Sequence, residues 1–173
     1  GNTVVMKPAE QSTVIADRLM KIFLEAGLPK EALQLVPARG ETVGRQLVNH
    51  NKIHMISFTG SKNVGLEIVK ACADVKPDQE FVKRCVVEMG GKNALIIDSD
   101  ADLDEAVDGA LYSAFGFSGQ KCSAASRIIV VDEIYDRFVE RLHEAAKSIH
   151  LDAADNPKAY LGPVIDKEAY DRI

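Results

Sequence analysis

The stretch MISFTGSKNVGLEIVKAC, residues 55–72, holds the pattern that decides the fold. Residues 55–58 form a short apolar run that is typical of a buried strand, and residues 63–73 follow the spacing of an amphipathic helix. The inner side of that helix is expected to carry Gly65, Ile68, Val69 and Cys72. Gly60 lies between the two segments and marks a tight turn. A strand that leads directly into a helix predicts an α/β fold.

The same alternation extends toward the N-terminus. Residues 3–6 and 33–36 are further strand-like runs. Between them Ser12 is placed to cap a helix, and Gly27 and Pro29 to end it. The buried side of this helix is expected to hold Ile15, Leu19, Ile22 and Ala26, and residues 41–49 predict a further helix. The order βαβαβα predicts parallel strands with right-handed crossovers, and ligands where strands end and helices begin.

A second α/β unit is expected after the glycine pair Gly90-Gly91. Residues 94–97 and 127–131 predict strands, residues 103–112 predict a helix, and Asp132 is expected to cap a last long helix. The inner side of that helix should hold Tyr135, Phe138, Leu142, Ala145 and Ile149, and the tail from Leu151 is expected to be a loop. We therefore predict two domains, residues 1–89 and residues 90–173.

Composition excludes several classes of protein. With 46% hydrophobic and 27% charged residues among 173, the chain has too much apolar surface for disorder and too many charges for a membrane protein. A net charge of −5 argues against a nucleic-acid partner, although residues 1–89 carry two more bases than acids and suit a small anion better. Three cysteines without a CxxC pair or an export signal indicate reduced thiols, in the cytoplasm or, in a eukaryote, the mitochondrial matrix.

Two groups of possible metal ligands fail the usual requirements. Residues 98–104 are rich in Asp, but Leu103 and Gly109 stand where a calcium loop needs Gly and Glu. A solvated helix start explains this run. His50 and His54 are four residues apart but lack a third ligand. We expect packing or surface histidines and no metal site.

The turn from Gly60 to Gly65 is a candidate phosphate site. Backbone N–H groups and the dipole of the following helix could receive an anion there. A P-loop is excluded because Leu66 and Glu67 replace the Lys and Ser or Thr that it requires, and the pattern is not GxGxxG. A plain strand-to-helix turn is the alternative.

Cys122 and Glu88 are the candidates for catalysis. Cys122 lies in FGFSGQKCSA, residues 115–124, where small residues allow backbone to approach a substrate and Lys121 could favour the thiolate. Glu88 ends an apolar strand, and burial there would suit a carboxyl group to general-base chemistry. The alternatives are an inert buried thiol, as expected for Cys72, and a structural salt bridge.

Five segments occur in the order found in the aldehyde dehydrogenase superfamily, which the chain resembles along its whole length. They are MKPAE at residues 6–10, FTGS at 58–61 with Gly65, EMGGK at 88–92, GQKC at 119–122 and LGPVI at 161–165. The resemblance implies a Rossmann-like NAD-binding domain in which Lys7 and Glu10 hold the adenosine ribose and Ser61, in the turn with Gly60 and Gly65, contacts the pyrophosphate. It also implies the start of a catalytic domain.

The resemblance also implies a mechanism. Cys122 is the nucleophile that forms a thiohemiacetal and then a thioester with an aldehyde, and Glu88 is the general base that activates water. The family's oxyanion asparagine lies upstream of such a segment and its second cofactor-ribose glutamate lies downstream. The chain therefore looks like an internal fragment, expected to be inactive alone and part of a homo-oligomer when intact.

Within the superfamily, residues 88–93 and 115–124 most resemble the 1-pyrroline-5-carboxylate dehydrogenases, which oxidise glutamate semialdehyde to glutamate in proline catabolism. That resemblance implies that Ser123 binds the distal carboxylate of the substrate, whereas a bond to local backbone is the alternative. Two other functions stay open. An acylating, coenzyme A-dependent dehydrogenase would not need Glu88, and a non-catalytic nucleotide-binding module would have an unreactive Cys122.

Overall fold

The computed structural model describes all residues from 1 to 173 and divides them into two compact units, Gly1–Glu88 and Met89–Ile173. This division falls one residue before the expected boundary. Strands and helices alternate along most of the chain, and all three strand pairs are parallel. The expected α/β class with parallel strands is therefore confirmed. None of the helices is both long and apolar enough to cross a membrane.

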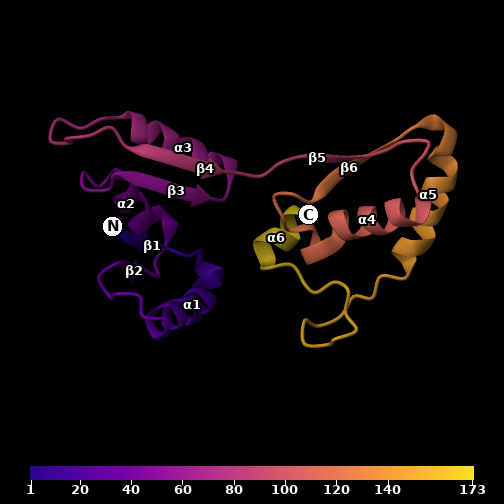
Figure 1. Cartoon of the computed structure of the whole chain (residues 1–173), viewed down its shortest axis with the longest axis horizontal. Coiled ribbons are helices and arrows are strands. Elements are labelled where there is room, and N and C mark those ends of the chain that lie inside the picture. Colours follow the sequence, from indigo (N-terminus) through magenta and orange to yellow (C-terminus); the bar gives the residue numbers. More distant parts are fainter. The chain divides into compact units, whose positions relative to one another are not determined.

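The first unit contains two parallel strand pairs and the helices that connect their strands (Figure 1). Strand β1 (Val4–Met6) pairs with β2 (Leu33–Leu35), and β3 (Met55–Thr59) pairs with β4 (Arg84–Glu88). The helices are α1 (Thr13–Glu25), α2 (Arg45–Asn49) and α3 (Lys62–Ala73), with short helical turns at Glu10–Ser12 and Gly40–Gly44. Each long helix thus links two parallel strands.

Helix α3 packs on β4 through its small and apolar side. Gly65, Ile68 and Cys72 are buried, as expected, but Val69 is 43% exposed and does not belong to that side. On the strands, Ile56 pairs with Cys85 and Phe58 with Val87, so these half-buried side chains share one face of the sheet. The expected strand-to-helix unit is present, with a narrower buried stripe.

The expected buried side of α1 is wrong. Ile15 is 72% exposed and Ile22 is 60% exposed, whereas Ala16 is buried. Met20 and Leu24, four and eight residues after Ala16, are half-buried. The helix carries two apolar stripes of the same period, so spacing alone cannot choose between them, and the stripe that contains the small Ala16 faces inward. Ser12 precedes the helix, but its side chain makes no capping hydrogen bond.

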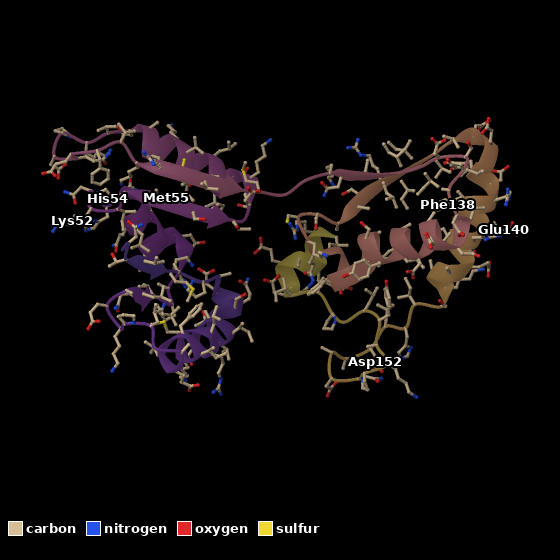
Figure 2. All side chains as sticks on the ribbon, viewed as in Figure 1. Lys52, His54, Met55, Phe138, Glu140 and Asp152 are labelled. Atoms are coloured by element: carbon tan, nitrogen blue, oxygen red, sulfur yellow. The ribbon has the colours of Figure 1, made fainter.

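The second unit is built on the parallel pair β5 (Asn93–Ile97) and β6 (Ala125–Val130). Its helices are α4 (Leu103–Phe115), α5 (Asp132–Lys147) and α6 (Lys167–Arg172), with a short turn at Gly116–Gly119. The core joins side chains of β5, α4 and α5, namely Ile97, Leu103, Val107, Ala110, Ile134 and Phe138. Phe138, labelled in Figure 2, is 1% exposed.

Three expectations for this unit are corrected. Tyr135 is 50% exposed, and Ile134 takes its expected place in the core. Asp132 is the first residue of α5 rather than its cap, since the N-cap position is Val131. The tail from Leu151 is not wholly a loop, because Asp166 caps α6 by accepting a hydrogen bond from the N–H of Ala169 at 2.8 Å. An Asp three residues before a helical N–H is a cap signal that apolar spacing misses.

Candidate functional site

The segment before Cys122 has an unusual backbone. Phe117 and Ser118 both have φ of 56°, and Gly119 has φ of 68°. Left-handed backbone is unfavourable for residues with a Cβ, so two such residues in succession require support from the rest of the fold. Cys122 follows this turn and is exposed, as a nucleophile that meets a substrate must be.

Two side chains of the turn are tethered to residues 162–165. The hydroxyl of Ser118 donates a hydrogen bond to the carbonyl oxygen of Gly162 at 2.9 Å. The side-chain oxygen of Gln120 accepts one from the backbone N–H of Ile165 at 3.0 Å. Two sequence segments of the resemblance, GQKC and LGPVI, therefore lie together in the structure.

The ammonium group of Lys121 lies over two aromatic rings. Its Nζ is 5.6 Å from the ring centroid of Tyr112 and 5.5 Å from that of Phe117. Both distances allow cation–π attraction. Lys121 thus helps to support the left-handed turn.

The backbone carbonyl group of Cys122 is hydrogen-bonded to Asn93, the first residue of β5. Asn93 Nδ2 donates hydrogen bonds to the carbonyl oxygens of Cys122 at 2.7 Å and Ala124 at 3.1 Å. A Cβ placed on Gly91 would lie 3.3 Å from the same Cys122 oxygen, which explains why glycine suits that position. Arg127 adds a hydrogen bond to the carbonyl oxygen of Lys92 at 2.8 Å.

Glu88 is the last residue of β4. It pairs with Thr59, and its carbonyl oxygen accepts a hydrogen bond from the N–H of Gly60 at 3.0 Å. Its side chain is exposed, so the expected burial of this carboxyl group is not found in the chain. Glu88 ends the first unit and Cys122 belongs to the second.

The turn from Gly60 to Gly65 joins β3 to α3. Ser61 is the N-cap of this helix, and its hydroxyl accepts a hydrogen bond from the N–H of Val64 at 3.3 Å. A Cβ on Gly60 would lie 2.5 Å from the ring of Phe58, so only glycine fits there without movement of the ring. Gly65 is buried, which brings α3 close to the strands.

Lys7 and Glu10 meet at the carboxyl end of β1. The Nζ of Lys7 lies 3.6 Å from Oε1 of Glu10 and donates a hydrogen bond to the carbonyl oxygen of Ala38 at 3.0 Å. Oε1 of Glu10 also accepts one from the N–H of Gly40 at 2.7 Å. Backbone hydrogen bonds, first from Glu10 itself and then from Gly40, lower the pKa of the Glu10 carboxyl, and the charge of Lys7 adds to the effect.

The remaining candidates have structural partners. His54, labelled in Figure 2, stacks on Phe81 with ring centroids 3.7 Å apart. Nδ1 of His50 accepts a hydrogen bond from the N–H of Lys52. Cys72 lies on α3 and its thiol is buried. Burial is the main cause that raises the pKa of this thiol, and the nearby Cys85 thiol on β4 raises it further. Cys72 is therefore packed inside the first unit, whereas His50 and His54 are exposed side chains with local partners.

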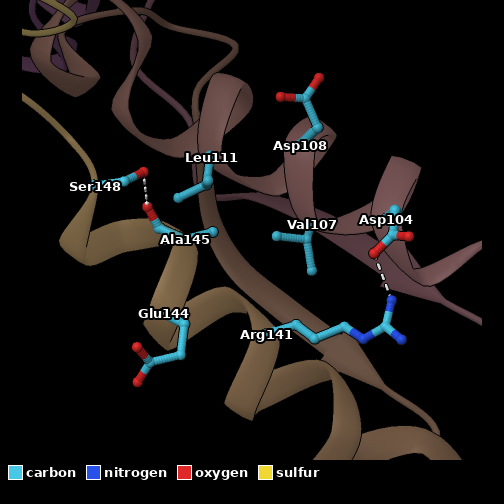
Figure 3. A pocket seen from close by; sticks show the side chains of 8 residues that line it. All are labelled: Asp104, Val107, Asp108, Leu111, Arg141, Glu144, Ala145 and Ser148. Carbon is cyan, nitrogen blue, oxygen red and sulfur yellow. Dashed lines mark hydrogen bonds and ion pairs between the residues drawn. The ribbon is translucent and has the colours of Figure 1, made fainter.

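A hollow lies elsewhere, between α4 and α5 (Figure 3). Its volume is about 480 Å³, and its lining includes Arg141 and Asp104, which form an ion pair. It contains none of the residues that the sequence singled out as functional. The catalytic expectation therefore stays with the loop of Cys122.

Comparison with known proteins gives the same family along the entire chain. The model of the aldehyde dehydrogenase family matches residues 1–173. The chain is 46% identical to 1-pyrroline-5-carboxylate dehydrogenase 1 of Halalkalibacterium halodurans and 46% identical to 1-pyrroline-5-carboxylate dehydrogenase 2 of Bacillus subtilis. Each match covers all of this chain and 34% of the relative, so the chain spans about one third of their length.

Solved structures agree. Proline utilization A from Bdellovibrio bacteriovorus, inactivated by N-propargylglycine, is 67% identical with a TM-score of 0.95, over 99% of this chain and 18% of that one. The 1-pyrroline-5-carboxylate dehydrogenase from Thermus with bound NAD is 44% identical with a TM-score of 0.95, over 99% of this chain and 33% of that one. The chain belongs to the aldehyde dehydrogenase family.

Proposed function

We propose that this chain is part of an NAD-dependent dehydrogenase that oxidises glutamate semialdehyde to glutamate, with its first unit binding NAD and its second starting the catalytic domain. The observation that carries the proposal is an exposed cysteine in a supported glycine-rich loop, in a chain that matches 1-pyrroline-5-carboxylate dehydrogenases from end to end. The Thermus relative is described with NAD, which supports the choice of cofactor.

The residues of the first unit fit NAD chemically. The twelve-residue helix α3 begins directly after β3, and its N-terminus suits a pyrophosphate. Gly60 has no space for a side chain, so backbone is what an incoming phosphate would meet there. Glu10 presents a carboxylate that accepts hydrogen bonds, as recognition of ribose hydroxyls requires, and Lys7 fixes that carboxylate. NAD, when bound, supplies the acceptor for a hydride.

Cys122 performs the covalent step. Its thiolate sulfur adds to the aldehyde carbon, and the electron pair of the C=O bond moves to oxygen. The oxyanion needs hydrogen-bond donors, and the backbone N–H of Cys122 is one that the chain provides. When the carbonyl re-forms with loss of hydride to the acceptor, the carbon is left as a thioester on Cys122.

Glu88 completes the cycle as general base. Its carboxylate takes a proton from water while the oxygen of that water adds to the thioester carbon. Collapse of this second adduct breaks the carbon–sulfur bond, releases the carboxylic acid and returns Cys122 as a thiolate. A coenzyme A thiol would replace water in an acylating enzyme, and Glu88 would then be unnecessary.

Ser123 is proposed to bind the distal carboxylate of the substrate. Its side chain is exposed and makes no hydrogen bond to the rest of the chain, so the alternative role of bonding local backbone gains no support. A hydroxyl group next to the nucleophile is free to donate to a substrate that extends past the reacting carbon.

The test is NAD reduction by the full-length enzyme with glutamate semialdehyde, in wild type, Cys122→Ser and Glu88→Gln. We expect Cys122→Ser to abolish turnover, and Glu88→Gln to retain a first burst of NADH but lose steady turnover. Glutamate should be the product. Turnover that depends on coenzyme A and survives Glu88→Gln would establish the acylating reaction, and bound NAD without turnover would establish a binding module.

A further inference from the structure

Asn93 holds the backbone on both sides of the residue that follows the nucleophile. One amide nitrogen reaches the carbonyl oxygens of Cys122 and Ala124, at 2.7 Å and 3.1 Å. These two oxygens flank Ser123 in the sequence. A single side chain therefore constrains the peptide that begins at Cys122 and the peptide two residues later.

The strand pairing shows why a side chain is needed here. Asn93 pairs with Ala125, but the next pair is Ala94 with Arg127, so Ser126 is an extra residue in β6. Such an irregularity bends a strand and interrupts its ladder of hydrogen bonds. Residues 122–124 precede β6 and have no ladder partner on β5. The amide of Asn93 substitutes for the missing backbone donors.

The backbone that precedes Asn93 is also held in place. Arg127 binds the carbonyl oxygen of Lys92 from the opposite strand at 2.8 Å. Gly91 lies so close that an added Cβ would approach both the Cys122 oxygen and the Asn93 side chain at 3.3 Å. The amide therefore meets Cys122 from a defined direction, which a flexible support would not provide.

We propose that Asn93 is a positioning residue for Cys122, which sets the direction of its Cα–Cβ bond and hence the place of its sulfur relative to the oxyanion donors. This inference rests on the proposed role of Cys122. Its effect should be confined to reactions that pass through a tetrahedral oxyanion, because these depend on the geometry between sulfur and donor.

Two reagents distinguish the position of the Cys122 sulfur from the exposure of its thiol in the full-length protein. Neither reaction needs NAD. With p-nitrophenyl acetate, the thiolate adds to the ester carbonyl, an oxyanion forms and nitrophenolate leaves. With iodoacetamide, the thiolate displaces iodide directly and no oxyanion forms. The ratio of the acylation rate to the alkylation rate of Cys122 measures positioning, since a loss of thiol exposure lowers both rates together.

Asn93→Asp keeps the shape of the side chain but replaces the donor by an acceptor that faces two carbonyl oxygens. We expect acylation to fall by about 10- to 100-fold, as for a nucleophile displaced by up to an ångström. Alkylation should stay within about threefold of wild type, and Asn93→Gln, which keeps the amide, should recover part of the acylation rate. Asn49→Asp is the matched control, because Asn49 makes the same amide-to-carbonyl bond to Arg45 on α2.

The inference is overturned if acylation and alkylation fall by the same factor, or if a folded Asn93→Asp protein acylates at the wild-type rate. Should Asn93→Asp fail to fold by circular dichroism, Asn93→Ser, which removes the donors without adding charge, takes its place under the same criteria. Cys122→Ser distinguishes a failure of the proposed nucleophile from a failure of the proposed positioning role of Asn93. A nitrophenolate burst that survives Cys122→Ser refutes the proposed nucleophile, whereas a burst lost in Cys122→Ser but unchanged in the Asn93 variants refutes only the positioning role.

Discussion

The hydroxyl of Ser118 is hydrogen-bonded at 2.9 Å to the carbonyl oxygen of Gly162, 44 residues further along the chain. Ser118 does this with a left-handed backbone, as does its neighbour Phe117. The bond therefore offsets part of the cost of an unfavourable conformation next to Cys122.

Replacement of Ser118 distinguishes the contribution of its hydrogen bond from the cost of its left-handed backbone. Ser118→Ala loses the hydrogen bond and keeps the unfavourable φ, whereas Ser118→Gly loses the bond but removes the steric cost. We expect Ser118→Ala to be less stable than Ser118→Gly by about 1 kcal/mol. Urea unfolding of both variants measures this difference, and equal stabilities would contradict a left-handed backbone at this residue.

The three thiols should differ in reactivity toward iodoacetamide. Cys122 is exposed, Cys85 half-buried and Cys72 buried, and the thiolate is the reactive form. We expect labelling in the order Cys122, Cys85, Cys72 in the folded protein, and similar rates for all three in urea. Peptide mass mapping after brief, substoichiometric labelling reads out the order. Early labelling of Cys72 in folded protein would exclude Cys122 as the reactive thiol.

Burial of Cys72 also predicts a dependence of stability on pH. Because the folded protein raises the pKa of this thiol, the unfolded chain loses its proton first as the pH increases. The contribution to stability is complete below about pH 8.5, where the unfolded thiol ionises, and is lost as the pH rises through the raised pKa. Urea unfolding between pH 7 and 10 should show a steeper decline in wild type than in Cys72→Ala, and parallel declines would argue against it.

Two glycines offer opposite outcomes for the same substitution. Gly60→Ala would place a Cβ 2.5 Å from the ring of Phe58, so we expect a loss of about 1–3 kcal/mol. Gly109 lies within α4 and an added Cβ there meets nothing within 4 Å. Gly109→Ala should stabilise by about 0.5–1 kcal/mol through helix propensity. Thermal unfolding of the two variants checks both signs.

Glu10 should set the preference for NAD over NADP in the full-length enzyme. A glutamate carboxylate is charged across the physiological range, and the lowered pKa of Glu10 acts in the same direction. This charge would repel a 2′-phosphate. We expect Glu10→Gln to reduce the NAD to NADP ratio of kcat/KM roughly tenfold. Glu25→Gln, at the end of α1, is the control. Equal use of both cofactors by wild type would show that Glu10 does not face the ribose.

Ser123 should determine the preference for a substrate with a distal carboxylate. A site built to hydrogen-bond a substrate group rejects analogues that lack it, because its donors stay unpaired. We expect Ser123→Ala to lower kcat/KM for glutamate semialdehyde about tenfold and to leave that for a plain aliphatic aldehyde nearly unchanged. An equal effect on both aldehydes would assign Ser123 to the structure of the loop.

Local patterns predicted the elements of this fold better than their packing. The strand-to-helix turn at Gly60 and the parallel pairing follow from nearby residues and from the handedness of crossovers. The buried side of α1 could not be predicted, because Ile15 and Ala16 begin two stripes of equal period. Which stripe faces inward depends on how closely the helix approaches the strands.

At the candidate site, too, residues with a local sequence signal could be predicted and residues that act through distant contacts could not. Cys122 and Glu88 could be proposed from the sequence because their residue types and neighbours suggest chemistry, and their catalytic roles stay predictions. Asn93 and Ser118 were missed as functional candidates, since their partners lie 29 to 44 residues away and nothing adjacent signals the contact. An Asn directly after EMGGK was the only local hint.

The left-handed turn before Cys122 also bears on how the second unit folds. Contacts that close loops of 44 and 45 residues, from Ser118 to Gly162 and from Gln120 to Ile165, form at a high entropic cost and against local backbone preference. We therefore expect the core of α4 and α5 to form early and the turn to reach its native shape late. In a chain emerging from the ribosome, the loop of Cys122 would therefore lack its native conformation until residues 162–165 had been synthesised.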